Sequence, residues 1–261
     1  MLEIYNLSFS FGKRQILHDI TVSYGAAMVH GLIGPNGSGK TTLLKNICRI
    51  YPTQEGQVKL LGEDCQTMSR RLLSSRISLV PQNPRINFPI SVYDLVLMGR
   101  YPRLKRFQAL SSLDREVVEQ AMKATNTGHL RQRSLTELSG GEAQLVMIAR
   151  ALATEANVIL LDEPTASLDI SNTLAVMELL EELKNQDKTI LTSIHDLNQA
   201  RRFCDTITIL DHGKIYFYGP AEQAFTPTAM KEVFHVIPVK STEMLDFHSL
   251  PSMMARRETT T

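Results

Sequence analysis

The sequence contains no tryptophan, and aromatic residues make up only 6% of its 261 residues. This scarcity argues against the aromatic stacking platforms with which many proteins bind single-stranded nucleic acid. The formal net charge of +1 also gives no strong overall field toward nucleic acid or an acidic lipid surface. We therefore expect no nucleic-acid partner.

Cysteine and long hydrophobic runs are also scarce. The three cysteines, Cys48, Cys65 and Cys204, are odd in number and form no CxxC pair. A disulfide framework or a zinc site is therefore not expected, and a reducing cytosol fits the composition best. The sequence has no run of about 18 apolar residues, and its first residues lack the pattern of a signal peptide. If the protein works at a membrane, we expect a partner to hold it there.

The hydrophobic pattern indicates an α/β fold. Hydrophobic residues make up 43% and charged residues 21% of the chain, which suits one sizeable domain or a core with a small subdomain. Aliphatic segments at 26–34, 158–161 and 189–194 predict buried strands, and alternation near the amino terminus predicts short antiparallel strands. From about 91 to 153 the spacing is mostly helical. We predict a parallel α/β core with a helical insertion and antiparallel strands at one edge.

A glycine-rich loop follows the first of these buried strands. It spans 34–41 with the spacing GxxxxGKT, and a helical pattern follows at once. Glycines allow backbone N–H groups to turn inward around phosphates, and the positive end of the next helix favours an anion there. Lys40 would reach the β- and γ-phosphates and Thr41 would ligate Mg²⁺. The alternative, a glycine turn with a chance Lys-Thr, does not explain the strand and helix on either side.

Two acids end the strand at 158–161. Asp162 and Glu163 directly follow four aliphatic residues. Asp162 would hold Mg²⁺ through its water, and Glu163 would orient or deprotonate the attacking water. Solvated acids that merely end a strand are the alternative, which the glycine loop upstream makes less attractive.

The segment Leu138–Glu142, with the sequence LSGGE, precedes an amphipathic helix. Ser139 is a good N-cap, and Gly140 and Gly141 leave the backbone amides bare, so the segment predicts a second anion site. One γ-phosphate needs only one cradle. We therefore expect this site to serve the nucleotide of another copy, with a plain helix cap as the alternative.

Over nearly its whole length, to about residue 240, the sequence resembles the ATP-binding cassette (ABC) ATPases. The segment LSGGE matches their signature motif, Gln82 their Q-loop glutamine and Ser167–Asp169 their D-loop. His195, after a predicted strand, matches their switch histidine, and Phe11 lies where the family places an aromatic ring on the adenine.

The resemblance implies a P-loop NTPase fold with a RecA-like core, an antiparallel β subdomain and a helical insertion at about 83–153. It implies a nucleotide-binding domain at 1–240 and leaves 241–261 as a C-terminal tail. Two copies would pack head to tail and bury two ATP molecules with Mg²⁺. The implied catalytic residues are Glu163, His195 and Gln82, and the implied metal ligands are Thr41, Gln82 and Asp162. The implied nucleotide-binding residues are Phe11, Gly34, Pro35, Asn36, Gly37, Ser38, Gly39, Lys40, Thr41, Thr42, Ser139, Gly140, Gly141, Glu142 and Asp169.

The stretch 88–102 looks like that of importer ATPases for iron-siderophore, haem and cobalamin, as do 168–171 and 195–200. This likeness implies a separate membrane permease, indirectly a substrate-binding protein, and a peripheral place on the cytoplasmic face of the inner or plasma membrane. Zinc and manganese importer ATPases share the run VLMGRY and are the alternative. A soluble cassette acting on DNA or ribosomes usually has a long coiled-coil insertion or tandem cassettes. A regulatory module that does not hydrolyse ATP would not need Glu163 and His195.

Two features depart from these expectations or stand outside them. Leu145 occupies a position in the signature helix where the family often has arginine. Arg100, Arg103, Lys105 and Arg106 form a short basic run that we interpret as solvated surface, with steering toward lipid headgroups or a partner loop as the alternative.

Overall fold

The computed structural model describes residues 1–82 and 89–236. The strands in this part of the chain are β1 (Leu2–Phe11), β2 (Arg14–Tyr24), β3 (Val29–Ile33), β4 (Glu55–Leu60), β5 (Glu63–Asp64), β6 (Ile77–Val80), β7 (Val158–Asp162), β8 (Thr189–Ser193), β9 (Thr206–Asp211) and β10 (Lys214–Pro220). The α-helices are α1 (Lys40–Ile47), α2 (Arg70–Arg76), α3 (Val92–Leu97), α4 (Ser112–Ala124), α5 (Gly140–Ala153), α6 (Ile170–Asn185), α7 (Leu197–Phe203), α8 (Ala221–Ala224) and α9 (Pro227–Phe234). Short 3₁₀ segments occupy Met98–Arg103, Gly128–Leu130 and Leu135–Glu137.

The strands form two sheets. The larger sheet has the order β10-β9-β3-β8-β7-β6, in which β10 pairs antiparallel with β9 and every other pair is parallel. The smaller sheet, β2-β1-β4-β5, is antiparallel. The predicted α/β fold with a parallel core and antiparallel strands at one side is therefore confirmed. Because β3, β8 and β7 are neighbours and parallel, their carboxyl ends meet at one edge of the sheet, where ligands of such folds bind.

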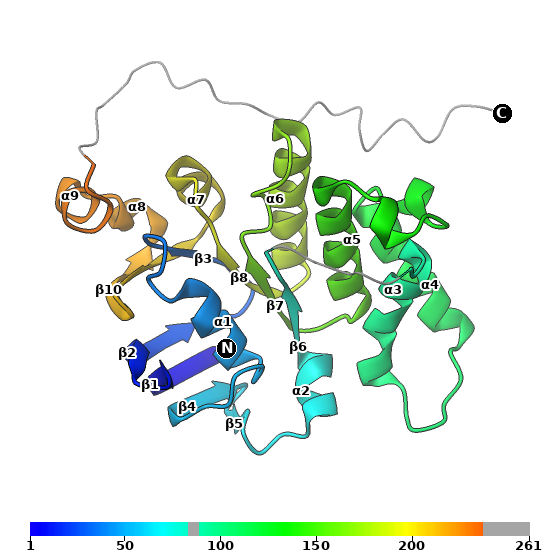
Figure 1. Ribbon diagram of the computed structural model, residues 1–261, viewed down its shortest axis with the longest axis horizontal. Helices are drawn as coiled ribbons and strands as arrows, with labels where there is room; N and C mark the ends of the chain where they lie inside the picture. The colour runs from blue at the N-terminus through cyan, green and yellow to red at the C-terminus, as the bar shows by residue number, and fades with distance from the viewer. Residues whose placement is uncertain (83–88, 237–261) are drawn as a thin grey trace.

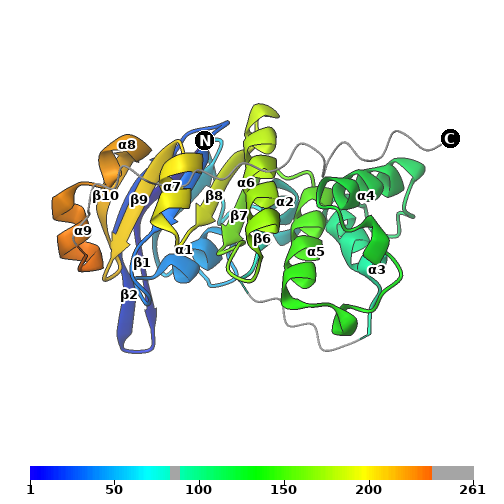
Figure 2. The same cartoon turned by 90° about the horizontal axis from the view of Figure 1, so that it is seen from above.

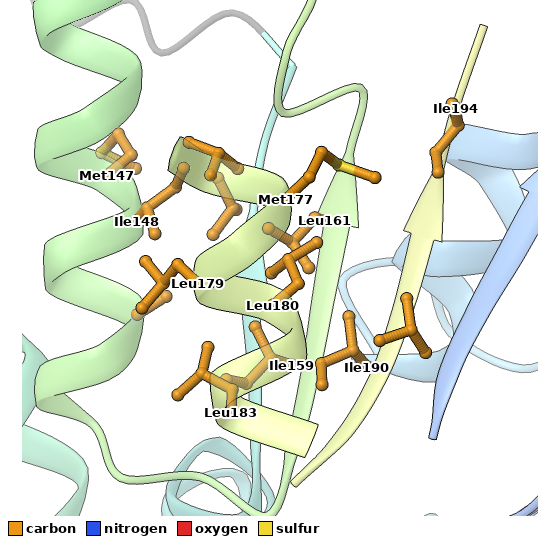
Figure 3. Close-up of a cluster of buried hydrophobic side chains, with 14 of the residues drawn as sticks. Met147, Ile148, Ile159, Leu161, Met177, Leu179, Leu180, Leu183, Ile190 and Ile194 are labelled. Carbon is orange, nitrogen blue, oxygen red and sulfur yellow. The ribbon is translucent and has the colours of Figure 1, made fainter. Parts of the chain in front are cut away.

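Both faces of the parallel sheet are buried, as the aliphatic runs predict. Along β7, Ile159 and Leu161 belong to one hydrophobic cluster, while Val158 and Leu160 belong to the other. Figure 3 shows the first cluster, in which side chains of α5 and α6 pack against β7 and β8. The second cluster lies between the parallel sheet, α1, α2 and the antiparallel sheet. The strands that carry the site are thus held from both sides.

A group of helices, α3, α4 and α5, lies at one end of the molecule in both views, while α8 and α9 lie at the other (Figures 1 and 2). The helical part of the chain therefore lies at 92–153, as the spacing predicts. Residues 83–88 and 241–261 lie outside the described residues. The assignment of 1–240 as one nucleotide-binding domain, with an insertion beginning at 83, stays a prediction.

The basic run at 100–106 differs from the solvated surface that the sequence suggests. Arg100 is buried, and its Nε donates to Asp114 Oδ1 at 2.9 Å. Its Nη1 donates to the carbonyl oxygen of Ala153 and to Glu155 Oε2, both at 2.7 Å. A buried guanidinium is tolerated because these partners satisfy it. The expectation is therefore wrong for Arg100, which joins α4 to the end of α5.

We predict that Asp114→Asn lowers the free energy of unfolding by about 2 kcal/mol near neutral pH, because Arg100 loses a charged partner. Hydrogen bonds from the Ser111 side chain and backbone, with Arg100, lower the pKa of Asp114 from 3.8 to about 2. A carboxyl with a lowered pKa contributes stability above its unfolded-state value, and this contribution is lost as the pH falls toward 2. Urea unfolding should therefore show the gap between variant and wild type closing from pH 5 downward.

Glu119→Gln is the matched control, because Glu119 pairs with Arg131 where both side chains are about half exposed. Its effect should stay within about 0.5 kcal/mol. A gap for Asp114→Asn that does not change with pH would show that the carboxylate charge is not what stabilises this junction.

Candidate active site

The glycine-rich loop leads from β3 into α1. Gly34, Gly37 and Gly39 have φ of +150°, +80° and +108°, so the loop needs residues without a Cβ where it turns. The helix begins at Lys40, and the Lys40 Nζ donates to the carbonyl oxygens of Gly34 at 2.7 Å and Pro35 at 3.1 Å. The ammonium group thus lies against the first two residues of the loop.

The electrostatics of Lys40 depend on two opposing effects. Burial lowers the pKa of Lys40 from its ordinary value, and the negative charges of Glu163 and Asp162 act in the opposite direction. The Lys40 ammonium therefore lies within electrostatic reach of both acids, and a cation beside two acids suits a phosphate group accompanied by a metal ion.

Asp162 connects three elements of the core. This aspartate is buried, and its Oδ2 accepts a hydrogen bond from Thr41 Oγ1 at 2.7 Å. Its Oδ1 accepts from Ser193 Oγ at 2.9 Å. The two predicted metal ligands on α1 and β7 are therefore brought together, with β8 as a third support.

The carboxylate of Glu163 lies between two other predicted catalytic residues. His195 Nε2 is 2.6 Å from Glu163 Oε1, and Gln82 Nε2 donates to Glu163 Oε2. Glu163 is the first residue after β7 and has a φ of +49°, in the left-handed region that non-glycine residues rarely adopt. Strained backbone of this kind is often found at functional sites, where surrounding contacts hold it. Three side chains from distant parts of the chain thus converge at one point.

The residues present fit a nucleotide with Mg²⁺. Ser38 Oγ is buried and has no hydrogen-bond partner among the described residues, so the loop has a polar atom in need of a ligand. Nothing lies within 4 Å of the position where a Cβ on Gly37 would stand. The Thr41 hydroxyl and the Asp162 carboxylate are oxygen donors of the type that Mg²⁺ prefers.

Phe11, at the end of β1, has a supported but open ring. It packs edge-on against Phe9 and Tyr51, with ring centroids 4.9 and 5.1 Å away. The side chain nevertheless remains 48% exposed. A fixed aromatic face of this kind suits stacking on a base.

The predicted second anion site begins α5. Ser139 is the N-cap of α5, and its Oγ accepts from the Glu142 backbone N–H at 3.2 Å and donates to Glu142 Oε2 at 2.8 Å. Hydrogen bonds from the Ser139 backbone and side chain lower the pKa of Glu142. Gly141 lies against the D-loop, since an added Cβ would be 3.1 Å from the Ser167 carbonyl oxygen. Asp169 caps α6 by accepting from the Asn172 backbone N–H.

The structure keeps α5, whose N-cap is Ser139, apart from α1, which follows the glycine-rich loop of the same chain. Figures 1 and 2 both separate α5 from α1, with α6 between them in the view. Ser139, Gly140 and Asp169 are exposed, and Gly141 is half-buried. The arrangement agrees with two half-sites that need a second copy to meet.

Sequence reasoning gave no role to two residues beside the site. Ser193 contacts both acids, and its hydroxyl accepts from the Glu163 backbone N–H at 2.8 Å. Gln144 is buried, and its Nε2 donates to the carbonyl oxygen of Pro81 at 3.3 Å, next to Gln82. Leu145, at the position where the resembled family often has arginine, packs against the hydrophobic core. The sequence carried one signal for Ser193, because the predicted strand 189–194, like the one that leads to Asp162, has a polar residue near its carboxyl end.

Residues 17–166, more than half of the chain, match the family model described as ABC transporter. The chain belongs to the ABC transporter family. The expectation of an ATP-binding cassette of a transport ATPase is thereby confirmed. No helix among the described residues of this cassette has the length and apolar character needed to cross a membrane.

Several named proteins are similar to this cassette over most of both chains. The iron(3+)-hydroxamate import ATP-binding protein FhuC of Bacillus subtilis is 37% identical, covering 90% of this chain and 88% of that one. The hemin import ATP-binding protein HmuV of Pseudomonas entomophila is 34% identical, covering 90% and 93%. The manganese transport system ATP-binding protein MntB of Bacillus subtilis is 35% identical, covering 89% and 92%. Among solved structures, the cassette MJ0796, a dimeric post-hydrolysis state bound to ADP and Pi, has a TM-score of 0.75 at 26% identity, covering 85% and 99%.

We predict that Gly34→Ala destabilises the cassette much more than Gly37→Ala does. Both glycines have positive φ, which costs an L-residue about 1 kcal/mol. At Gly34 a Cβ would also lie 2.0 Å from the carbonyl oxygen of Leu210, so the backbone must move, at a further cost of about 2 kcal/mol. Urea unfolding measures both variants, and equal losses would contradict the close approach of this loop to β9.

Proposed function

We propose that the cassette binds and hydrolyses ATP and powers uptake of an iron chelate (siderophore), haem or cobalamin through a separate membrane permease. The observation that carries the hydrolytic part is the convergence of Gln82 and His195 on the Glu163 carboxylate. Glu163 directly follows Asp162, which is bonded to Thr41 of the glycine-rich loop. The residues proposed to bind the phosphates, the metal ion and the attacking water are thereby adjacent.

Each part of this site has a proposed task. The amides of residues 34–42 and the Lys40 ammonium bind the ATP phosphates, and Phe11 stacks on the adenine. Thr41, Asp162 and Gln82 hold Mg²⁺, which when bound neutralises charge on the phosphates. Glu163 orients and deprotonates the attacking water, and His195 holds both the γ-phosphate and Glu163.

We propose that the catalytic unit is a head-to-tail dimer. Ser139, Gly140, Gly141, Glu142 and Asp169 then face the nucleotide held by the partner copy. The accessible N-terminus of α5 supports this arrangement, because it presents backbone amides to an anion outside its own chain. The dimeric, nucleotide-bound state of MJ0796 supports it further.

The proposed place of the cassette is the cytoplasmic face of the inner or plasma membrane, as a peripheral subunit on the permease. A substrate-binding protein would deliver the cargo to the other side of that permease. The relatives named for import support this assignment. Manganese import is the second candidate, because MntB matches almost as well as FhuC does. Zinc import belongs to the same alternative.

The cargo is best identified through the partners, since the cassette's site holds ATP rather than cargo. The permease that co-purifies with the cassette, or its binding protein, should retain an iron chelate, haem or cobalamin. Elemental analysis and absorption spectra of that preparation distinguish these from manganese and zinc. A preparation that holds manganese or zinc ions without a chelator would replace the first candidate by the second.

We predict that Glu163→Gln binds ATP, forms a stable dimer and loses turnover by at least about 100-fold, because the amide cannot accept the proton from water. Light scattering with ATP measures the dimer, and phosphate release measures turnover. Glu181→Gln, an exposed change on α6, is the matched control and should behave as wild type. Wild-type turnover of Glu163→Gln would remove Glu163 as the base.

We predict that Ser139→Arg inhibits the wild-type protein when the two are mixed. In a head-to-tail dimer, the wild-type loop then faces the arginine side chain of the variant, and that site cannot close on its nucleotide. Loss of the N-cap itself costs about 1 kcal/mol, which the packing of α5 should tolerate. A fixed amount of wild type should release phosphate more slowly as variant is added, whereas added Ser23→Arg, on the distant strand β2, should have no effect. If phosphate release by the wild type did not change as Ser139→Arg was added, the composite site would be contradicted.

A further inference from the structure

The hydroxyl of Ser193 lies between the two acids of the site. Ser193 is the last residue of β8 and is completely buried. Its Oγ is 2.9 Å from Asp162 Oδ1 and 2.8 Å from the Glu163 backbone nitrogen. One side chain on a neighbouring strand therefore contacts both the proposed metal ligand and the residue that carries the proposed base.

The strand pairing explains this position. Ser193 is the register partner of Asp162 in the parallel β7–β8 pair. Side chains at the same level of neighbouring strands point to the same face, so the hydroxyl and the carboxylate meet. Pairing ends at this level, and the Glu163 N–H beyond it donates to Ser193 Oγ.

The direction of both hydrogen bonds follows from the groups involved. The Glu163 N–H can only donate, so Ser193 Oγ accepts from it. The hydroxyl has one hydrogen, which goes to Asp162 Oδ1, and the second Asp162 oxygen accepts from Thr41. Alanine at position 193 would leave the Glu163 N–H and one Asp162 oxygen without this partner, in a place closed to water.

We propose that Ser193 is a positioning residue for ATP hydrolysis, which sets the Asp162 carboxylate toward the metal side and the Glu163 backbone toward the attacking water. The inference rests on the proposed roles of Asp162 and Glu163. Glu163 has positive φ, and its carboxylate contacts the side chains of His195 and Gln82. The hydrogen bond at its nitrogen fixes the other end of the residue, so that the carboxylate has one orientation.

The test compares Ser193→Ala, Ser193→Thr and Ser193→Val in the full-length chain. Threonine and valine have nearly the same shape and differ at this position by the hydroxyl. We expect kcat for ATP to fall about 10- to 100-fold in the alanine and valine variants, while threonine stays within a few-fold of wild type. KM for ATP should change little, because the loop that binds the phosphates is intact.

A second measurement does not depend on turnover. We expect the Mg²⁺ concentration that half-saturates binding of a non-hydrolysable ATP analogue to rise about 10-fold in Ser193→Ala and Ser193→Val, but not in Ser193→Thr. Thr192→Val is the matched control. Thr192 is equally buried on the same strand, and its hydroxyl lies 3.5 Å from the Ser193 carbonyl oxygen. It should leave both measurements unchanged.

The double variant Ser193→Ala with Glu163→Gln separates this inference from the proposed function. At a Mg²⁺ concentration that saturates every variant, Ser193 should act on turnover through Glu163 alone, so its removal should cost less than about two-fold on the Glu163→Gln background. Equal behaviour of threonine and valine in both measurements would overturn the inference. The inference would also be overturned if Ser193→Ala lowered kcat by the same factor on the Glu163→Gln background as in the wild type and left Mg²⁺ binding unchanged. Wild-type turnover of Glu163→Gln alone would instead overturn the part of the proposed function that makes Glu163 the base.

Discussion

The parallel pairing of β7 with β8 is the constraint on which the rest of the site depends. Its register sets Asp162 beside Ser193, and the chain beyond each strand then carries Glu163 and His195 toward each other. On the other side of β8, the pair with β3 sets the glycine-rich loop at the same edge. Thr41, at the start of α1, can reach Asp162 only because these three strands end together.

Hydrophobic burial holds this sheet but does not by itself fix its register. In a strand with one wet face, a slip of one residue would expose the core side chains. In β7 the residues of both faces are apolar, so the same slip would exchange one buried set for the other. The polar residues at the strand ends favour the observed register over a slipped one, because a slipped β7 would leave the buried Asp162 without the Thr41 and Ser193 hydroxyls. The hydrogen bonds that form the site therefore also help to specify the fold.

Local patterns predicted the parts of the molecule that are themselves local. The strand, glycine-rich loop and helix around Lys40 follow from consecutive residues, and so do the two acids at the end of β7 and the N-cap at Ser139. The errors and omissions arise where a residue's partner is distant in sequence. Arg100 looked like a solvated charge because its partners Asp114 and Glu155 lie 14 and 55 residues away. Ser193 was given no role because its contact with Asp162, across 31 residues, exists only in one register.

Helix α5, which begins within the signature motif, also combines local contacts with contacts to residues distant in sequence. One end presents Ser139 to the outside, where its hydroxyl is shared with Glu142 of the same helix turn. Near that end, Gln144 holds the carbonyl oxygen of Pro81, and the next residue, Gln82, donates to Glu163. The buried face of α5 packs into the hydrophobic core, so its first turns cannot shift independently of the rest. A partner that binds at Ser139 therefore contacts a helix that is itself bonded to Pro81, the residue before Gln82, and Gln82 in turn contacts the proposed base Glu163.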